Sequence, residues 1–464
     1  MKQPDSPTSS ENEKIRSARG SWLTRYSQLI AKFVPDALST AVFMLILIVI
    51  IALSVGNTLT ATVDAWYQGL WMLLPFTMQM TLILVLGSVM AATPLFKKII
   101  TSISRRPQTT TQVIALSVLF VSIVSYLNWG LALTLGPLAA IHFSNQAEIK
   151  KIPVDFPFLL AANVAAISVW QFGLSASGPL MMTTPGHFLE TVTGVMPLRS
   201  TIWSPAAIFL VIVFPVALTI TARLLMPNKP KPISMFPESQ KLIQEVSSQK
   251  ESNEEISFSV RVEHNYLIPL VLCVALLGWL YYHFRVKGMS LDINSLNTFF
   301  LLLCLLLHKN VHNFSRAVEG AVVACWPILI LYHFYAGIAG LIQFTSVGPI
   351  LADIFTPIST NWTFPFFTAV AGTLVAIFVP SSGGQWAIQG FVTTTLAKAI
   401  GLTPQRGMLA LGVGDQMGNL ISPFWYVIMA KVVRMDFKVF YGYGLIFALL
   451  WFLLGVIAFT FIPC

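Results

Sequence analysis

The sequence predicts an all-α polytopic membrane protein with inverted-topology repeats, two re-entrant hairpins and two broken transmembrane helices. First, 55% of the 464 residues are hydrophobic and only 10% are charged, whereas soluble domains carry about 25% charged residues. Second, the apolar runs are long and continuous, which indicates spanning helices and excludes the alternating strands of a β-barrel. Third, polar breaks recur in the same order in the two halves of the chain, which is typical of inverted repeats.

Charge and cysteine usage narrow the class further. The net charge is +9, but the basic residues cluster in a few connecting loops, which fits the positive-inside rule better than nucleic-acid binding. The four cysteines contain no CxxC pair and imply neither a disulfide nor a metal site. No cleavable signal peptide is apparent at the N-terminus.

The first half contains a polar tail, four spans or broken spans and one hairpin. The loop between the first two spans lacks Lys and Arg, whereas the next loop contains Lys97, Lys98, Arg105 and Arg106. This contrast predicts a cytoplasmic N-terminus. In chain order we expect a cytoplasmic tail 1–28, a first transmembrane repeat 29–226 and a cytoplasmic linker 227–263. Within the first repeat we expect spans at about 31–54 and 65–93, a hairpin at about 113–143, a broken span at about 155–182 and a span at about 201–226.

The second half repeats that order. A linking span 264–284 changes the parity, so that the second unit enters from the opposite side and the C-terminus lies outside. Within a second repeat 285–464 we expect spans at about 293–309 and 317–344, a hairpin at about 366–402, a broken span at about 406–430 and a last span at about 438–462. The total is nine spans and two hairpins. A chance likeness between two hydrophobic halves is the alternative.

The stretch from Val379 to Gly390 organises the second half. It separates two apolar runs, Phe366 to Phe378 and Phe391 to Leu402, that are each too short to cross a bilayer. Its proline and glycines interrupt a helix, and backbone freed in this way is tolerated at membrane depth only where protein or water covers it. We therefore predict a substrate site near the membrane centre. A polar loop outside the membrane is the alternative.

The hairpin tips and broken spans supply the candidate substrate ligands. Helix N-termini carry partial positive charge, so they can hold a carboxylate without a basic side chain. No Lys or Arg occurs at either tip or at either broken centre, which favours a small monoanion. The predicted substrate-binding residues are Asn128, Trp129, Gly130, Ser175, Ser177, Ser381, Ser382, Gly383, Gly384, Gln385, Trp386 and Gln389.

Asp415 is the only acid well inside a predicted span. A charge at the bilayer centre costs at least about 2.5–3.5 kcal/mol, so such residues are usually functional. We predict an ion-coupling role for Asp415, Asn419 and Asn163, in which Asp415 carries a proton or helps to ligate sodium. A structural role, capping the amides of a broken helix, is the alternative.

Two other classes of protein fit less well. An intramembrane enzyme could use a serine nucleophile, but the sequence has no GxSxG or HExxH motif and no histidine near either tip. A channel would need repeated subunits or a lined pore, and inverted halves argue against it. A transporter of another organic anion, such as a dicarboxylate or an amino-acid derivative, stays open.

The chain resembles the bacterial short-chain fatty acid transporter family of the ion transporter superfamily. The segments that carry this resemblance include Asn128 to Leu131, Gly173 to Ser177, Pro380 to Gly390 and Ser422 to Trp425. It implies import of short monocarboxylates such as butyrate or acetoacetate across the bacterial cytoplasmic membrane, coupled to H+ or Na+. The expected partners are that acid and the lipid bilayer, without nucleic acid and without a cofactor besides the ion; a homodimer stays open. The sequence departs from the family pattern at Ser382, Phe391, Asp415 and His333.

Overall fold

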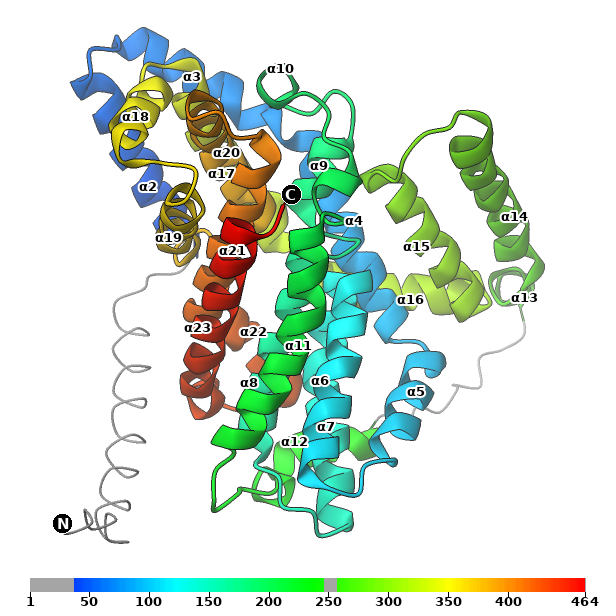
Figure 1. Ribbon diagram of the computed structural model, residues 1–464. Coiled ribbons are helices and arrows are strands. Elements are labelled where there is room, and N and C mark those ends of the chain that lie inside the picture. The colour runs from blue at the N-terminus through cyan, green and yellow to red at the C-terminus, as the bar shows by residue number, and fades with distance from the viewer. Residues whose placement is uncertain (1–36, 246–256, 464) are drawn as a thin grey trace, which may run out of the picture.

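The structure is a computed structural model that describes residues 37–245 and 257–463, and every regular element in these two ranges is a helix (Figure 1). Eight of the helical segments are long and apolar enough to cross a membrane. The predicted all-α, multi-pass membrane class is therefore confirmed. The tail 1–28, positions 31–36 of the first span, positions 246–256 of the linker and Cys464 lie outside the described residues.

Two sets of three helices form a reciprocal framework. Each set ends in a long apolar segment that is interrupted near a proline, Pro75 in one and Pro327 in the other. The middle and first helices of each set pack on the last helix of the other set. The two sets are α2 (Ala37–Ser54), α3 (Leu59–Met72) and α4 (Leu74–Ala91), and α15 (Ile293–His308), α16 (Val311–Val322) and α17 (Trp326–Phe344).

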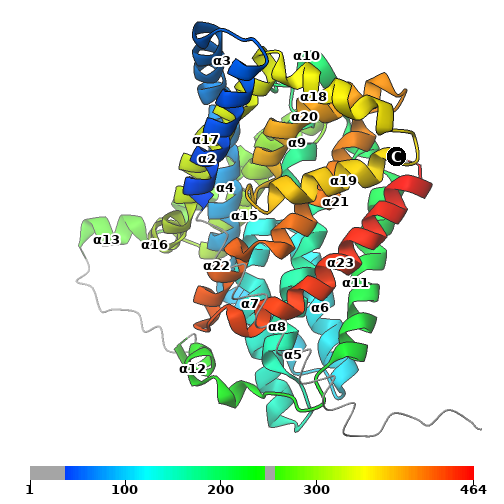
Figure 2. The same ribbon diagram turned by 90° about the vertical axis from the view of Figure 1, so that its left-hand side faces the viewer.

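Glycines allow α3 and α17 to touch along their backbones. A Cβ atom at Gly69 would lie 2.5 Å from the carbonyl oxygen of Ala336, and one at Gly340 would lie 2.5 Å from that of Ala65. Any larger residue at either position would push the two helices apart. Figures 1 and 2 show α2, α3 and α17 side by side at one edge of the molecule.

The remaining helices of each half follow one order: a helical hairpin, a broken helix and a closing helix. In the first half these are α6 (Thr110–Leu127) with α7 (Trp129–Ile149), α8 (Phe156–Ala166) with the 3-10 turn η1 (Ile167–Phe172) and α9 (Ser177–Thr183), and α11 (Pro205–Leu225). In the second half they are α19 (Phe364–Ala376) with α20 (Ser382–Ala399), α21 (Pro404–Ile421) with α22 (Pro423–Val433), and α23 (Lys438–Phe461). The closing helix α23 packs on α8, α11 and α21, which joins the two halves.

The helical breaks lie close to the predicted positions, but they are shorter than expected. Pro380 lies in the gap between α19 and α20, whereas Gly383 and Gly384 are already in the first turn of α20. These glycines permit close packing instead of unwinding the chain. A Cβ atom at Gly383 would lie 2.3 Å from Phe76 Cζ, and one at Gly384 would lie 2.5 Å from Tyr335 Cδ2.

The first hairpin also has longer arms than the sequence suggested. Its first arm, α6, has 18 residues and is apolar enough to cross a membrane alone. The re-entrant path of both hairpins through a bilayer stays a prediction.

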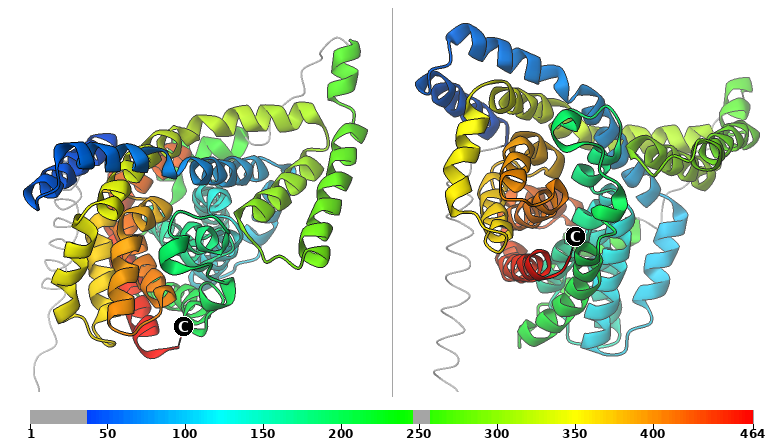
Figure 3. Two further views of the ribbon diagram at one scale, coloured as in Figure 1. Left: turned by 90° about the horizontal axis from the view of Figure 1, so that it is seen from above. Right: turned by 45° about the horizontal axis from the view of Figure 1, so that its top comes forward.

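Several connecting segments that we expected to be loops contain helices, including the linker 227–263 with α12 (Pro237–Glu245) and α13 (Phe258–Glu263). The basic segment after α4 forms α5 (Pro94–Ser104), and the segment after α17 contains α18 (Val347–Phe355). Both helices are shorter than a span and bury only a few residues, such as Ile100 in α5 and Ala352 in α18. Helix α14 (Leu267–Tyr281), the linking span, packs on α15 at the periphery, away from α19–α23 (Figures 1 and 3).

Candidate functional site

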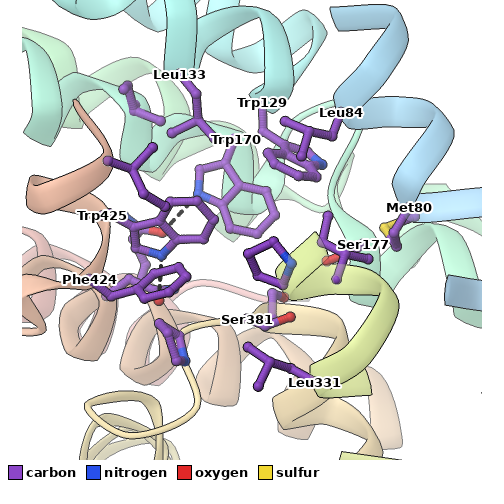
Figure 4. A pocket seen from close by; sticks show the side chains of 18 of the residues that line it. Met80, Leu84, Trp129, Leu133, Trp170, Ser177, Leu331, Ser381, Phe424 and Trp425 are labelled. Atoms are coloured by element: carbon purple, nitrogen blue, oxygen red, sulfur yellow. Dashed lines mark hydrogen bonds between the residues drawn. The ribbon is translucent and has the colours of Figure 1, made fainter. Parts of the chain in front are cut away.

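A cavity lies where the two halves meet. It is lined by residues of α4, α7, α8 with η1, α17, α20, α21 and α22, together with Ser177, the first residue of α9. The space free of protein atoms, including the open mouth, is about 980 Å³. The cavity, which we call the first cavity, is drawn in Figure 4.

Three helices begin at this cavity. Trp129 is the first residue of α7, Ser382 is the first of α20, and Phe424 is the second of α22, and all three residues line the cavity. The first N–H groups of a helix have no intrahelical acceptor, and the dipole adds partial positive charge there. Three such ends at one cavity create an electrostatic environment suited to an anion.

Side chains cap these helices, and in α20 the cap leaves other N–H groups available. Asn128 Oδ1 accepts from the Leu131 N–H at 2.8 Å, and Ser381 Oγ accepts from the Gly384 N–H at 3.3 Å. In α20 this leaves the N–H groups of Ser382 and Gly383 ahead of the first intrahelical bond.

Three tryptophans form much of the cavity wall (Figure 4). The ring centroid of Trp129 lies 6.1 Å from that of Trp170 and 6.5 Å from that of Trp425. Two of the indoles are fixed by hydrogen bonds: Trp170 Nε1 donates to Gln416 Oε1 at 2.8 Å, and Trp425 Nε1 donates to Asn419 Oδ1 at 3.1 Å. The wall is therefore apolar, rigid and oriented by α21.

Two donors among the lining residues lack a partner. Trp129 Nε1 and Tyr335 OH are buried and have no hydrogen-bond partner in the described structure. Buried polar groups are nearly always paired, so these donors are available to a bound ligand. None of the described residues that line this cavity is Lys or Arg. The cavity thus offers neutral donors and helix ends, without a fixed positive charge.

A second, smaller cavity lies beside the first. Its free space is about 290 Å³, and Ser382 lines both cavities. Gln171, Gln385 and Asp415 also line it, from η1, α20 and α21. In the described part of the chain, no three His, Cys, Asp or Glu side chains group as a metal site would require.

The predicted substrate ligands divide into lining and supporting residues. Trp129, Ser177, Ser381 and Ser382 line the first cavity, and Ser382, Gln385 and Trp386 line the second. The other predicted ligands line neither cavity: Asn128, Gly130, Ser175, Gly383, Gly384 and Gln389.

These supporting residues hold the lining residues in place. Ser175 Oγ accepts from the Trp129 N–H at 3.0 Å, and Gln389 Oε1 accepts from Gln385 Nε2 at 2.7 Å. Gly130 lets α7 approach α4, because a Cβ atom there would lie 2.9 Å from Leu84 Cα.

The predicted ion-coupling residues lie in two places. Asp415 Oδ2 accepts from Asn419 Nδ2 at 3.1 Å, so these two residues form one group. Asn163 is separate, because its Oδ1 accepts from Ser117 Oγ at 2.9 Å and its Nδ2 donates to the Gly136 carbonyl at 3.0 Å. The structure therefore places Asn163 as a tether between α6, α7 and α8 with both polar atoms of its amide paired.

The sequence analysis missed the tyrosines of α17. Tyr332 and Tyr335 line the first cavity, and Tyr332 OH accepts a hydrogen bond from Ser381 Oγ at 2.8 Å. They lie in an apolar span without a break, so the search for interrupted helices did not select them. The sequence does contain a signal that could have identified them: two tyrosines three residues apart in the middle of a span, which a helix places on one face.

Comparisons of the sequence with known proteins agree on one family. The family described as "Short chain fatty acid transporter" matches residues 21–462. This chain belongs to that family. Two proteins, each named "Putative short-chain fatty acid transporter", are similar over nearly their whole length. The one from Escherichia coli (strain K12) is 29% identical, covering 94% of this chain and 98% of its own, and the one from Haemophilus influenzae (strain ATCC 51907 / DSM 11121 / KW20 / Rd) is 28% identical, covering 92% and 97%.

One solved structure is similar over most of its length. The crystal structure of the Alcanivorax borkumensis YdaH transporter, described as having an unusual topology, covers 92% of this chain and 97% of its own. Its TM-score is 0.49 and its sequence identity is 14%.

Proposed function

We propose that this member of the family is a secondary active transporter that imports short-chain monocarboxylates, such as butyrate or acetoacetate, across the bacterial cytoplasmic membrane, coupled to a proton or sodium gradient. One observation carries the proposal: an aromatic cavity at which α7, α20 and α22 begin, with two unpartnered donors. The N-terminus would face the cytoplasm and the C-terminus the periplasm, with the two hairpins opening to opposite sides.

The donors of the first cavity match one carboxylate. Trp129 Nε1, Tyr335 OH and the free N–H groups of α20 offer several hydrogen bonds to its oxygens. Each charge-assisted hydrogen bond contributes roughly 1.5–3 kcal/mol, so two or three of them can hold one carboxylate.

The rest of the wall suits a short alkyl chain. Each additional methylene gains up to about 0.8 kcal/mol until the pocket is full. A second carboxylate would face indole and aliphatic surface, where an unpaired charge is strongly disfavoured.

Competition and counterflow in proteoliposomes test this function. Purified protein is reconstituted, and counterflow of labelled butyrate is challenged with acetate, butyrate, succinate and citrate. We expect butyrate to compete better than acetate, and succinate and citrate to compete poorly. If a dicarboxylate competes better than butyrate, the monocarboxylate assignment is wrong. If no acid of the series supports counterflow, the transport function itself is wrong.

A further inference from the structure

Two carboxamides on α21 hold two of the three indoles in the wall of the first cavity (Figure 4). Gln416 accepts the indole N–H of Trp170, and Asn419 accepts that of Trp425. Gln416 and Asn419 are three residues apart, so α21 presents them on one face. Trp170 belongs to η1 in the first half of the chain and Trp425 to α22 in the second. A single helix therefore fixes indoles that come from both halves.

The second hydrogen bond of Gln416 fixes the direction of its amide. An indole N–H can only donate, so the atom that faces Trp170 is the carboxamide oxygen. Gln416 Nε2 points the other way and donates to Ser168 Oγ at 3.0 Å. Both residues are buried, at 4% and 0% exposure. Turning the amide over would place two donors against each other, so Gln416 holds the indole in one orientation.

The backbone of Trp170 is fixed as well. Its N–H donates to Ser125 Oγ of α6 at 3.1 Å, so backbone and indole are held by two different helices. The indole has only two side-chain torsions, and with the backbone fixed these alone determine where the ring lies. Because Trp170 lines the cavity, any other rotamer of this large ring would change the cavity's shape. The bond to Gln416 is the contact that selects the rotamer seen.

We infer that Gln416 is a positioning residue that limits the chain length of the acid by holding the indole of Trp170. Asn419 and Trp425 form a second pair of the same kind. The inference rests on the proposed function, since it concerns which monocarboxylates the first cavity accepts. A methylene contributes to binding only while it enters free space. A chain that reaches the fixed ring would have to displace it and break its bond to Gln416, so lengthening the acid beyond that point weakens binding.

Competition against counterflow of labelled butyrate in proteoliposomes measures this limit. In the wild type we expect hexanoate and octanoate to compete less well than butyrate. Gln416→Met keeps a side chain of similar size but removes the acceptor of the indole N–H. The ratio of hexanoate affinity to butyrate affinity should then rise at least about fourfold, the gain for one buried methylene. Both affinities are measured in the same protein, so a smaller folded fraction does not change their ratio.

Ser168→Ala tests the same contact without altering the cavity wall. Ser168 lines neither cavity and accepts the hydrogen bond from Gln416 Nε2. Its loss frees the Gln416 amide to turn, so the affinity ratio should rise in the same direction as in Gln416→Met. This variant is also the milder of the two, because it removes one hydroxyl group and leaves the indole and its acceptor present.

A double-mutant cycle shows whether Gln416 acts through the indole. Trp170→Phe removes the N–H and part of the ring, so it should raise the ratio by itself. Adding Gln416→Met to Trp170→Phe should then change the ratio by less than about twofold, because the bond is already absent. If the two changes instead multiply, Gln416 acts by another route and the inference is wrong.

Trp451→Phe is the matched control. Trp451 Nε1 donates to the Val413 carbonyl of α21 at 3.1 Å, and Trp451 is fully buried and lines neither cavity. Its loss should lower the unfolding temperature but leave the ratio of hexanoate to butyrate affinity unchanged. A shift as large as that of Gln416→Met would mean that general loosening of α21 causes the effect, which would overturn the inference.

The outcomes separate this inference from the proposed function. If butyrate counterflow occurs but the wild type prefers octanoate, the indoles set no limit; the inference is wrong and the transport function stands. The same holds if Gln416→Met and Ser168→Ala both keep the wild-type ratio. If no acid of the series supports counterflow in the wild type, the proposed function is wrong and the inference falls with it.

Discussion

Removing one hydroxyl group, in Tyr335→Phe, should weaken acid binding while making the protein more stable. Tyr335 is 1% exposed, lines the first cavity, and its OH has no partner in the described structure. If that OH donates to the carboxylate, its loss removes a charge-assisted hydrogen bond of roughly 1.5–3 kcal/mol. Affinity for butyrate should then fall about 10- to 150-fold.

The same change should raise the unfolding temperature of the protein without substrate. Leaving a buried polar group unsatisfied costs about 1–3 kcal/mol, and phenylalanine removes that group without changing the ring. The assays are the concentration dependence of butyrate counterflow and the thermal unfolding of the purified protein without acid.

Two other tyrosines provide matched controls. Tyr426 OH is equally buried and unpartnered but lines neither cavity, so Tyr426→Phe should be stabilising and leave butyrate affinity unchanged. Tyr332→Phe should instead lower the unfolding temperature, because Ser381 Oγ loses its acceptor. Wild-type butyrate affinity in Tyr335→Phe would refute the assignment of its hydroxyl to the carboxylate.

The remaining predictions probe packing, coupling and topology. Gly384→Ala should lower both thermal stability and butyrate affinity, because its Cβ atom would lie 2.5 Å from the ring of Tyr335. Overpacking of this kind costs about 1–3 kcal/mol, and an unchanged unfolding temperature together with unchanged affinity would contradict the packing. Asp415→Asn should fold and insert but fail to accumulate acid against a gradient, and wild-type accumulation would leave Asp415 only a structural role. Single cysteines at the exposed positions Ser102 and Asn361, in a chain without the four native cysteines, should label from the cytoplasmic and outer faces respectively; labelling from one face would contradict the inverted repeat.

The positions of the helical breaks could be predicted from the sequence because local chemistry determines them. Asn128, Ser381 and Ser422 each cap a following helix, and such residues are strong N-terminal signals wherever they interrupt an apolar run. Helix α5 was missed because it is short and mixed in composition, and α18 because its nine residues, although apolar, are too few for a span.

The extent of the second break was also misjudged. A glycine pair is compatible both with an unwound turn and with a tightly packed helix. Only the neighbouring rings of Phe76 and Tyr335 determine which of the two occurs.

The candidate site could be predicted only in part, since pairing between distant segments decides what each polar side chain does. Trp129 and Ser382 lie next to visible breaks, and the structure places both at the cavity. Asn163 occupies the position in its half that Asp415 approximately occupies in the other, yet its amide is fully paired with Ser117 and Gly136. No feature of the sequence around Asn163 distinguishes a tether from a ligand.

The charges of the two cavities bear on how transport would be coupled. Asp415 is the only charged side chain among the described residues that line either cavity. The empty site therefore holds one negative charge when Asp415 is ionised. With one coupling cation, a proton or a sodium ion, and one carboxylate bound, the sum is again one negative charge. Moving a net charge across a membrane potential costs about 2.3 kcal/mol per 100 mV. If one ion is bound per acid, the loaded site and the empty site carry equal charge and cross the membrane at the same electrical cost. The concentration gradients of the ion and the acid, and not the membrane voltage, would then drive net uptake.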